Sequence, residues 1–232
     1  MSENPAAEPV SDADATPLPD ARRALLDALS TELLALHPRG RIIVAIDGVD
    51  GAGKTRFADD WAPVLRARGA AVVRASIDGF HQPRSARYAR GRESAEGYYR
   101  DSFDLGALRA RLVEPFRSGA EEVGTAVFDH ASDSAVDERE SGIPRDAVLL
   151  LDGIFLHRPE LRTLWHWTIW LDVPPEVRDA RLRARDGAHS VAPRYTEGQY
   201  LYEKEANPRR AASVIIDNAD PASPRRLFDD FC

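Results

Sequence analysis

Short apolar runs recur along the chain, separated by polar segments that can form helices. Each run is continuous rather than alternating, as in strands buried on both faces of a parallel sheet. The runs cover residues 41–47, 71–77, 147–151, 167–171 and 213–216. This order of strands and helices predicts an α/β fold with a five-stranded, mainly parallel sheet that carries helices on both faces.

Helical spacing of apolar residues marks three segments, residues 20–36, 105–116 and 174–185. Residues 82–97 and 131–144 are polar and show no clear period, so we expect surface loops or a small flap there. Residues 1–20 contain acidic side chains and prolines but no lysine or arginine. They predict a disordered acidic N-terminal tail in front of a single domain over residues 21–232.

The formal net charge of −7 disfavours polyanionic partners such as nucleic acids. Cys232 is the only cysteine, which excludes an intrachain disulfide framework and a CxxC metal site. No run of about 18 apolar residues occurs, so no membrane span is expected. Together these features favour a cytoplasmic protein that acts on small molecules.

Residues 48–55, with the sequence GVDGAGKT, match the phosphate-binding pattern GxxxxGK[ST] between an apolar strand and a helix start. Glycines let backbone N–H groups turn around a phosphate, and the helix start adds a favourable dipole. The chain has only two lysines, Lys54 and Lys204, and otherwise uses arginine, so an ammonium is specifically required here. The pattern predicts binding of ATP with Mg²⁺ through Gly48, Asp50, Gly51, Ala52, Gly53, Lys54 and Thr55.

Two further carboxylates follow predicted strands. Asp152 ends an apolar strand and can hold Mg²⁺ together with the Thr55 hydroxyl, or it can simply begin a turn. Asp78 emerges at the same carboxyl end of the sheet, where it can act as the base for an acceptor hydroxyl. The alternative for Asp78 is an ordinary Asp-Gly turn.

Three arginines, Arg178, Arg181 and Arg185, share one face of a predicted helix. They can form a lid that offsets charge on the transferring phosphoryl group, or a solvated basic face. A second group of arginines, at positions 84, 87, 90 and 92, can grip an anionic acceptor or belong to a solvated loop.

The phosphate loop, Asp78-Gly79-Phe80, Asp152-Gly153-Ile154 and the Arg178 to Asp186 series resemble the uridine kinase and phosphoribulokinase family, over roughly residues 41–220. The resemblance implies a three-layer P-loop fold with an arginine-bearing lid. It also implies that Lys54 and Thr55 bind ATP and Mg²⁺ and that Asp78 is the catalytic base. The family usually has Glu where this chain has Asp152.

The acceptor region departs from the uridine kinase pattern. Where the family has Asp-His-Pro, this chain has Tyr98-Tyr99-Arg100-Asp101, and Asp133 replaces a base-contacting histidine. Asp78-Gly79-Phe80 and Ser102-Phe103-Asp104 are equally similar to bacterial pantothenate kinases. The candidate acceptor residues are Phe80, His81, Tyr98, Tyr99, Asp101, Asp129 and His130.

The sequence therefore predicts a kinase that phosphorylates a hydroxyl of a small molecule, with a nucleoside as the first candidate, as in uridine kinases. A pantothenate kinase-like or other small-alcohol kinase is the first alternative. A nucleotide-binding regulatory protein without an acceptor site is the alternative from another class.

Overall fold

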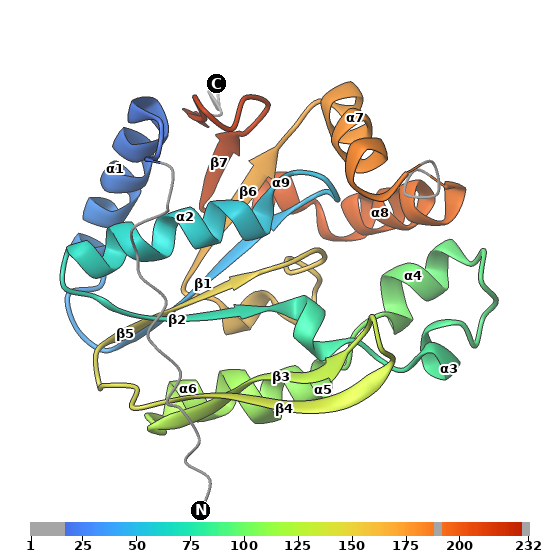
Figure 1. The fold of residues 1–232 in the computed structure, drawn as a ribbon, viewed down its shortest axis with the longest axis horizontal. Coiled ribbons are helices and arrows are strands. Elements are labelled where there is room, and N and C mark those ends of the chain that lie inside the picture. Colours follow the sequence, from blue (N-terminus) through green and yellow to red (C-terminus); the bar gives the residue numbers. More distant parts are fainter. Residues whose placement is uncertain (1–16, 188–191, 229–232) are drawn as a thin grey trace, which may run out of the picture.

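The computed structural model describes residues 17–187 and 192–228 as an α/β fold around one main sheet (Figure 1). The sheet order is β2-β5-β1-β6-β7-β8. Its strands are β1 (Arg41–Gly48), β2 (Ala71–Ser76), β5 (Ala147–Asp152), β6 (Trp167–Asp172), β7 (Val214–Asp217) and β8 (Arg225–Leu227). The first five in sheet order are parallel, which confirms the predicted fold class, and β8 adds an antiparallel edge strand that we did not predict.

The continuous apolar runs occupy the centre of the sheet because both of its faces are covered. Every residue of β5 is buried, as is every residue of β1 after Arg41. In the register of the sheet, Ile46 of β1 and Ser76 of β2 both pair with Asp152 of β5. The carboxyl ends of these three strands are therefore level, and the segments that follow them meet at one edge.

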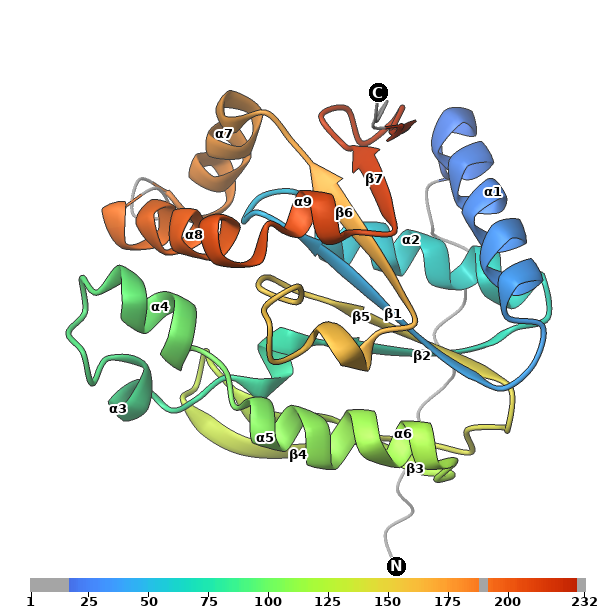
Figure 2. The ribbon, with the colours of Figure 1, turned by 180° about the vertical axis from the view of Figure 1, so that it is seen from behind.

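Helices cover both faces of the sheet. Helix α2 (Lys54–Ala67) crosses one face beside α1 (Asp20–Leu36), whereas α9 (Pro208–Ala211) lies on the opposite face (Figures 1 and 2). Helices α7 (Pro175–Asp186) and α8 (Pro193–Ala206) follow β6. The predicted helix over residues 105–116 consists of α5 (Leu105–Ala107), a π-helical segment (Leu108–Val113) and α6 (Glu114–Ser118).

The two polar stretches contain more structure than we predicted. A hairpin of β3 (Glu122–Asp129) and β4 (Ser134–Ser141) forms a separate two-stranded sheet. Helix α3 (Arg84–Arg87) lies in the first stretch and α4 (Ala95–Asp101) begins in it, where we expected surface loops or a small flap rather than helices. A short 3₁₀ turn, Ile77–Phe80, follows β2, and another, Arg162–Leu164, precedes β6.

The predicted acidic tail falls mainly on residues 1–16, which lie outside the described part of the chain, as does Cys232. Leu18 is described and packs against the hydrophobic core in front of α1. No helix in the described part of the chain is long and apolar enough to cross a membrane.

Candidate active site

The phosphate loop joins the end of β1 to the start of α2. Gly53 adopts a left-handed conformation with φ of 87° immediately before α2, which a residue with a side chain rarely adopts. A Cβ atom on Gly48 would lie 2.8 Å from the Leu171 carbonyl oxygen, so close packing requires glycine there. The side chain of Ala52 is buried beneath the loop. Residues 48–55 thus form a tight turn at a helix N-terminus.

Several backbone N–H groups of this turn are available to bind an anion. The N–H groups of Gly51, Gly53 and Lys54 donate no hydrogen bond to another atom of the described residues. The Lys54 ammonium donates to the Val49 carbonyl at 3.0 Å and so lies across the loop. Free amides, a cation and a helix dipole together fit a phosphate chain.

A cavity of about 310 Å³ opens in front of this loop. It brings together the predicted phosphate-binding, metal-binding and base residues. Its lining consists of Asp50, Gly51, Gly53, Lys54, Thr55, Arg56, Asp78, Asp152, Gly153, Ile154 and Arg185.

The candidate metal ligands lie side by side within the cavity. The Thr55 hydroxyl donates to Asp152 Oδ2 at 2.7 Å, and Arg74 Nη2 donates to Asp152 Oδ1 at 2.8 Å. No group of three or more His, Cys, Asp or Glu side chains is placed to hold a metal in residues 17–187 and 192–228. One hydroxyl and one carboxylate fit Mg²⁺, because that ion usually keeps several waters and shares oxygens of the nucleotide phosphates.

Asp78 lies in the 3₁₀ turn that follows β2, and its side chain is 59% exposed. Tight packing on both sides fixes the backbone of this turn. A Cβ on Gly79 would lie 2.7 Å from Ala126 Cβ, and one on Gly153 would lie 2.2 Å from Ile77 Cγ2. The hairpin and the turn after β5 therefore hold Asp78 at the edge of the cavity, and its carboxylate remains open to solvent.

The three predicted lid arginines have different surroundings. Arg185 lines the cavity. Arg181 instead donates to the carbonyls of Gly51 (3.3 Å), Asn218 (3.0 Å) and Ala219 (2.7 Å), and Arg178 contacts Asp179 at 2.8 Å. The three arginines do share one helix face, but only Arg185 of the three lines the cavity. Arg181 instead joins the phosphate loop to residues 218 and 219.

His81 and His130 form a stacked pair close to Asp78. Their ring centroids are 4.8 Å apart, and the His81 ring lies 4.5 Å from that of Phe103. His81 Nδ1 is 2.8 Å from the Asp78 carbonyl oxygen. Burial lowers the pKa of His81, an effect that outweighs the opposite influence of Asp78. The three rings thus form an aromatic cluster beside Asp78, although none of them lines the cavity.

Tyr98 connects helix α4 to the phosphate loop by donating its phenol hydrogen to Asp50 Oδ2. Gln199 of α8 accepts a hydrogen bond from the Asp50 backbone N–H at 3.1 Å, and the Tyr195 ring packs edge-on against Tyr98 at 4.9 Å. Burial, reinforced by Asp50, raises the pKa of Tyr98. We did not predict Gln199 or Tyr195, although Pro193 at a helix start and polar or aromatic residues at 195, 199 and 202 mark one helix face.

The remaining candidate acceptor residues are either buried in the core or bonded to other residues of the protein. Phe80 and Tyr99 are fully buried, so neither side chain is open to a substrate in this structure. Asp101 pairs with Arg90 at 2.7 Å. Asp129 accepts from the Ser132 hydroxyl and the Ala131 N–H, which closes the turn of the hairpin.

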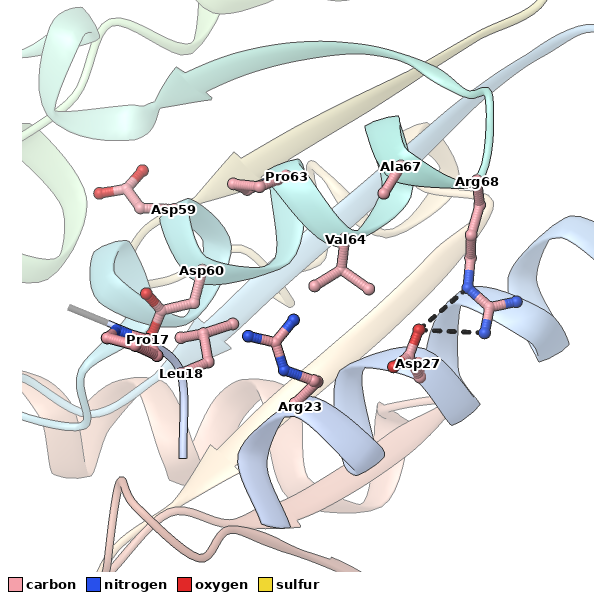
Figure 3. Close-up of a pocket in the computed structure, with 10 residues that line it drawn as sticks. All are labelled: Pro17, Leu18, Arg23, Asp27, Asp59, Asp60, Pro63, Val64, Ala67 and Arg68. Carbon is pink, nitrogen blue, oxygen red and sulfur yellow. Dashed lines mark hydrogen bonds and ion pairs between the residues drawn. The ribbon is translucent and has the colours of Figure 1, made fainter. Parts of the chain in front are cut away.

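A larger cavity of about 760 Å³ lies between α1 and α2, where Arg23 points between the two helices (Figure 3). None of the residues from 48 to 55 lines it. Its carboxylates already have arginine partners, as in the bonds of Asp27 to Arg68 at 3.0 Å and of Asp60 to Arg22 at 2.7 Å. The phosphate-binding chemistry belongs to the smaller cavity.

Solved structures share this architecture. A possible uridine kinase from Bacillus stearothermophilus superposes with a TM-score of 0.68 at 24% identity, over 83% of this chain and 97% of that one. A candidate fructose transport system kinase from Silicibacter sp. TM1040 gives a TM-score of 0.63 at 27% identity, over 81% and 94% of the two chains. The chain has the fold of the uridine kinase-like P-loop kinases. The resemblance inferred from the sequence is thereby confirmed.

The curated proteins that are similar in sequence to this chain are also named as kinases. The chain is 36% identical over 161 residues to a thymidylate kinase from Xanthomonas campestris, a match that covers 64% of this chain. A uridine kinase from Leuconostoc citreum is 23% identical over 146 residues, which covers 62% of this chain and 68% of that protein. The chain spans 63% of the length of the thymidylate kinase it matches. No protein-family model matches the chain.

Proposed function

We propose that this protein transfers the γ-phosphoryl group of ATP to a hydroxyl of a small molecule, and that this molecule is a nucleoside. One observation carries the proposal. Lys54, Thr55, Asp152, Asp78 and Arg185 all line one cavity of about 310 Å³ at the carboxyl ends of three adjacent strands. Phosphate binding, metal binding and a base are thus available within one space.

Each group has a specific part in the proposed reaction. The loop amides and Lys54 bind the β- and γ-phosphates. The oxygens of Thr55 and Asp152 hold Mg²⁺, which supplies charge neutralisation on the phosphates when bound. Asp78 orients the acceptor hydroxyl and accepts its proton. Arg185, on α7, offsets the charge on the transferring group.

An uncharged acceptor fits the surroundings of Asp78 better than a phosphorylated one. Three of the four arginines at positions 84, 87, 90 and 92 are engaged elsewhere: Arg87 pairs with Asp133 at 3.1 Å, and Arg92 lies over the Tyr88 ring. Arg90 pairs with Asp101, and the rings of His81, His130 and Phe103 form an aromatic cluster beside Asp78. Aromatic rings favour stacking with a base, whereas a phosphate requires an unpaired guanidinium or ammonium.

A nucleoside monophosphate is the second candidate acceptor, because the relatives with over 30% identity are named thymidylate kinases. Its phosphate would need a cation such as Arg56, which lines the cavity, or Arg87 after release from Asp133. The two candidates differ in whether the phosphate acceptor atom is a hydroxyl oxygen or a phosphate oxygen. Product analysis therefore separates them.

The test measures acceptor-dependent ADP release with ATP and Mg²⁺ against uridine, cytidine, pantothenate and thymidine monophosphate. We expect turnover with a nucleoside and formation of its monophosphate. The Asp78→Asn variant should lose on the order of a hundredfold or more in kcat. Asp137→Asn is the matched control, because that exposed carboxylate lies on β4, away from the cavity.

Turnover only with thymidine monophosphate would replace the nucleoside by a nucleotide acceptor. Binding of Mg·ATP without transfer to any acceptor would instead support a regulatory nucleotide-binding protein. Unchanged kcat in Asp78→Asn with the true acceptor would remove the base assignment and leave the kinase activity in place.

A further inference from the structure

A fully buried carboxylate lies directly beneath the phosphate loop. Asp47 is the residue before Gly48, and its side chain has no exposed surface. Its Oδ1 atom accepts a hydrogen bond from the Gly48 N–H at 2.7 Å. The first residue of the phosphate loop is thus held by the carboxylate that precedes it.

The other oxygen of this carboxylate joins two distant segments. Asp47 Oδ2 accepts from the His157 N–H at 3.0 Å and from His157 Nδ1 at 2.8 Å. The Tyr202 hydroxyl of α8 also donates to Oδ2, and it accepts the His157 N–H at 3.0 Å. His157 and Tyr202 are buried as well, so water does not compete for these bonds.

The protonation states required by this arrangement are consistent with one another. Burial, strengthened by the negative charge of Asp47, raises the pKa of Tyr202 well above its ordinary value, so the phenol remains a donor. His157 must carry a hydrogen on Nδ1 to donate to the carboxylate. Its Nε2 atom has no hydrogen-bond partner among the described residues.

The segment that carries His157 begins at the candidate metal ligand. Phe155, three residues after Asp152, has a positive φ of 69°, which is unfavourable for a residue with a Cβ atom. Such a conformation persists only where the surroundings fix it. The Phe155 ring packs on Tyr98, Tyr99 and Tyr202 with centroids 5.0 to 5.3 Å apart, and His157 is tied to Asp47.

We propose that Asp47, His157 and Tyr202 form a positioning unit that sets the phosphate loop relative to the Asp152 segment and helix α8. None of the three lines the cavity, so they act through other residues. The unit links the start of the loop at Gly48, the turn after Asp152, and the helix whose Gln199 accepts from the Asp50 N–H. This inference rests on the nucleotide-binding part of the proposed function.

The geometry explains why a purely apolar core would not serve the same purpose. A buried carboxylate is tolerated only when donors surround it, and loss of one donor leaves charge without compensation. The hydrogen bonds are directional, so they fix the loop in one place rather than merely filling space. Removal of a donor should therefore change the affinity for phosphate as well as the stability of the fold.

The test compares full-length variants by calorimetric titration with Mg·ATP and by thermal unfolding. Tyr202→Phe removes one donor and retains the ring, and we expect its Kd for Mg·ATP to rise about tenfold. Ser30→Ala is the matched control. That buried hydroxyl accepts from Trp61 Nε1 at 2.9 Å within the packing of α1 on α2, so its loss should lower the melting temperature and leave Kd within about twofold.

A second pair of variants covers the case in which Tyr202→Phe does not fold. His157→Asn retains a side-chain N–H near the position of Nδ1, whereas His157→Leu removes it. We expect the Asn variant to bind Mg·ATP within about threefold of the parent and the Leu variant to bind at least about tenfold more weakly.

Equal Kd values for the parent protein and Tyr202→Phe, or for the Asn and Leu variants, would overturn the positioning role and leave only a structural one. Failure of the parent protein to bind Mg·ATP would instead overturn the proposed function. The two failures are therefore distinguishable.

Discussion

The Thr55 hydroxyl lies 2.7 Å from Asp152 Oδ2, which joins the first turn of α2 to the end of β5. The two residues are 97 positions apart in the chain, and the parallel pairing of β1 with β5 brings them together. The second oxygen of Asp152 is held by Arg74, which also pairs with Asp59. Asp152 is therefore oriented and placed next to the hydroxyl with which it would share Mg²⁺.

Replacing Asp152 by Asn should raise the Mg²⁺ concentration needed for half-maximal activity and lower kcat/KM about a hundredfold, because a neutral amide binds the cation weakly. The measurement is a Mg²⁺ titration of ADP release at saturating ATP. Asp59→Asn is the control, since it removes the other, exposed partner of Arg74. The same Mg²⁺ dependence in both variants would contradict a metal role for Asp152.

Arg185 and Arg181 should differ when each is replaced. Arg185→Ala should lower kcat by about a hundredfold with little change in the melting temperature, because this exposed side chain lines the cavity. Arg181→Lys should lower the free energy of unfolding by about 1–2 kcal/mol, because one ammonium cannot hold the carbonyls of Gly51, Asn218 and Ala219. Steady-state kinetics and urea unfolding of both variants check this. A loss of kcat without loss of stability in Arg181→Lys would place that residue in the lid.

Helices α4 and α8 approach each other at Gly198. A Cβ atom there would lie 2.7 Å from Tyr98 Cδ1 and 2.9 Å from the Ala95 carbonyl oxygen. Gly198→Ala should therefore lower the free energy of unfolding by about 1–3 kcal/mol and move Tyr98 away from Asp50. Urea unfolding measures the first effect, with Glu197→Ala, an exposed neighbour on α8, as the control. If both variants unfold at the same urea concentration, the contact is looser than the structure shows.

His81 should make the fold sensitive to mild acid. Burial lowers the pKa of His81 below its ordinary value of 6.5, and His130 and Arg87 act in the same direction. A lowered pKa means that His81 contributes stability above about pH 6.5, and that this contribution is lost as the pH falls through the folded-state value. Urea unfolding between about pH 7 and pH 5 should therefore show a steeper loss for the parent protein than for His81→Gln. Parallel curves would show that His81 titrates alike in the folded and unfolded chains.

The sheet and the phosphate loop could be predicted because their signals are local. Continuous apolar runs such as residues 147–151 are buried on both faces, and each run ends close to the observed strand end. The loop pattern requires glycine and lysine at fixed positions, and it fixes the place of α2. The position of Asp78 and Asp152 beside the loop could be predicted because parallel strands present their carboxyl ends at one edge of the sheet.

The features that could not be predicted from the sequence depend on contacts between distant segments. Most residues of β4 are exposed, so the strand shows no hydrophobic alternation, and its pairing with β3 was not visible in the sequence. The direction of the Arg181 side chain is set by carbonyls of residues 218 and 219, which no helical period can reveal. Asp47 looks like an ordinary strand end until His157 and Tyr202 are found around it.

The contacts that residues 218–221 make with the phosphate loop and α1 also have a consequence for folding during synthesis of the chain. Asn218 Nδ2 holds the Ala52 carbonyl at 2.7 Å, and Arg22 Nη1 reaches the Pro221 carbonyl, 199 positions later in the chain, at 3.0 Å. A ribosome that has produced α1, β1 and α2 has therefore not yet produced the residues that support the loop. Because the N-terminal part emerges first, the phosphate loop should reach its supported arrangement only after residues 218–221 have been synthesised.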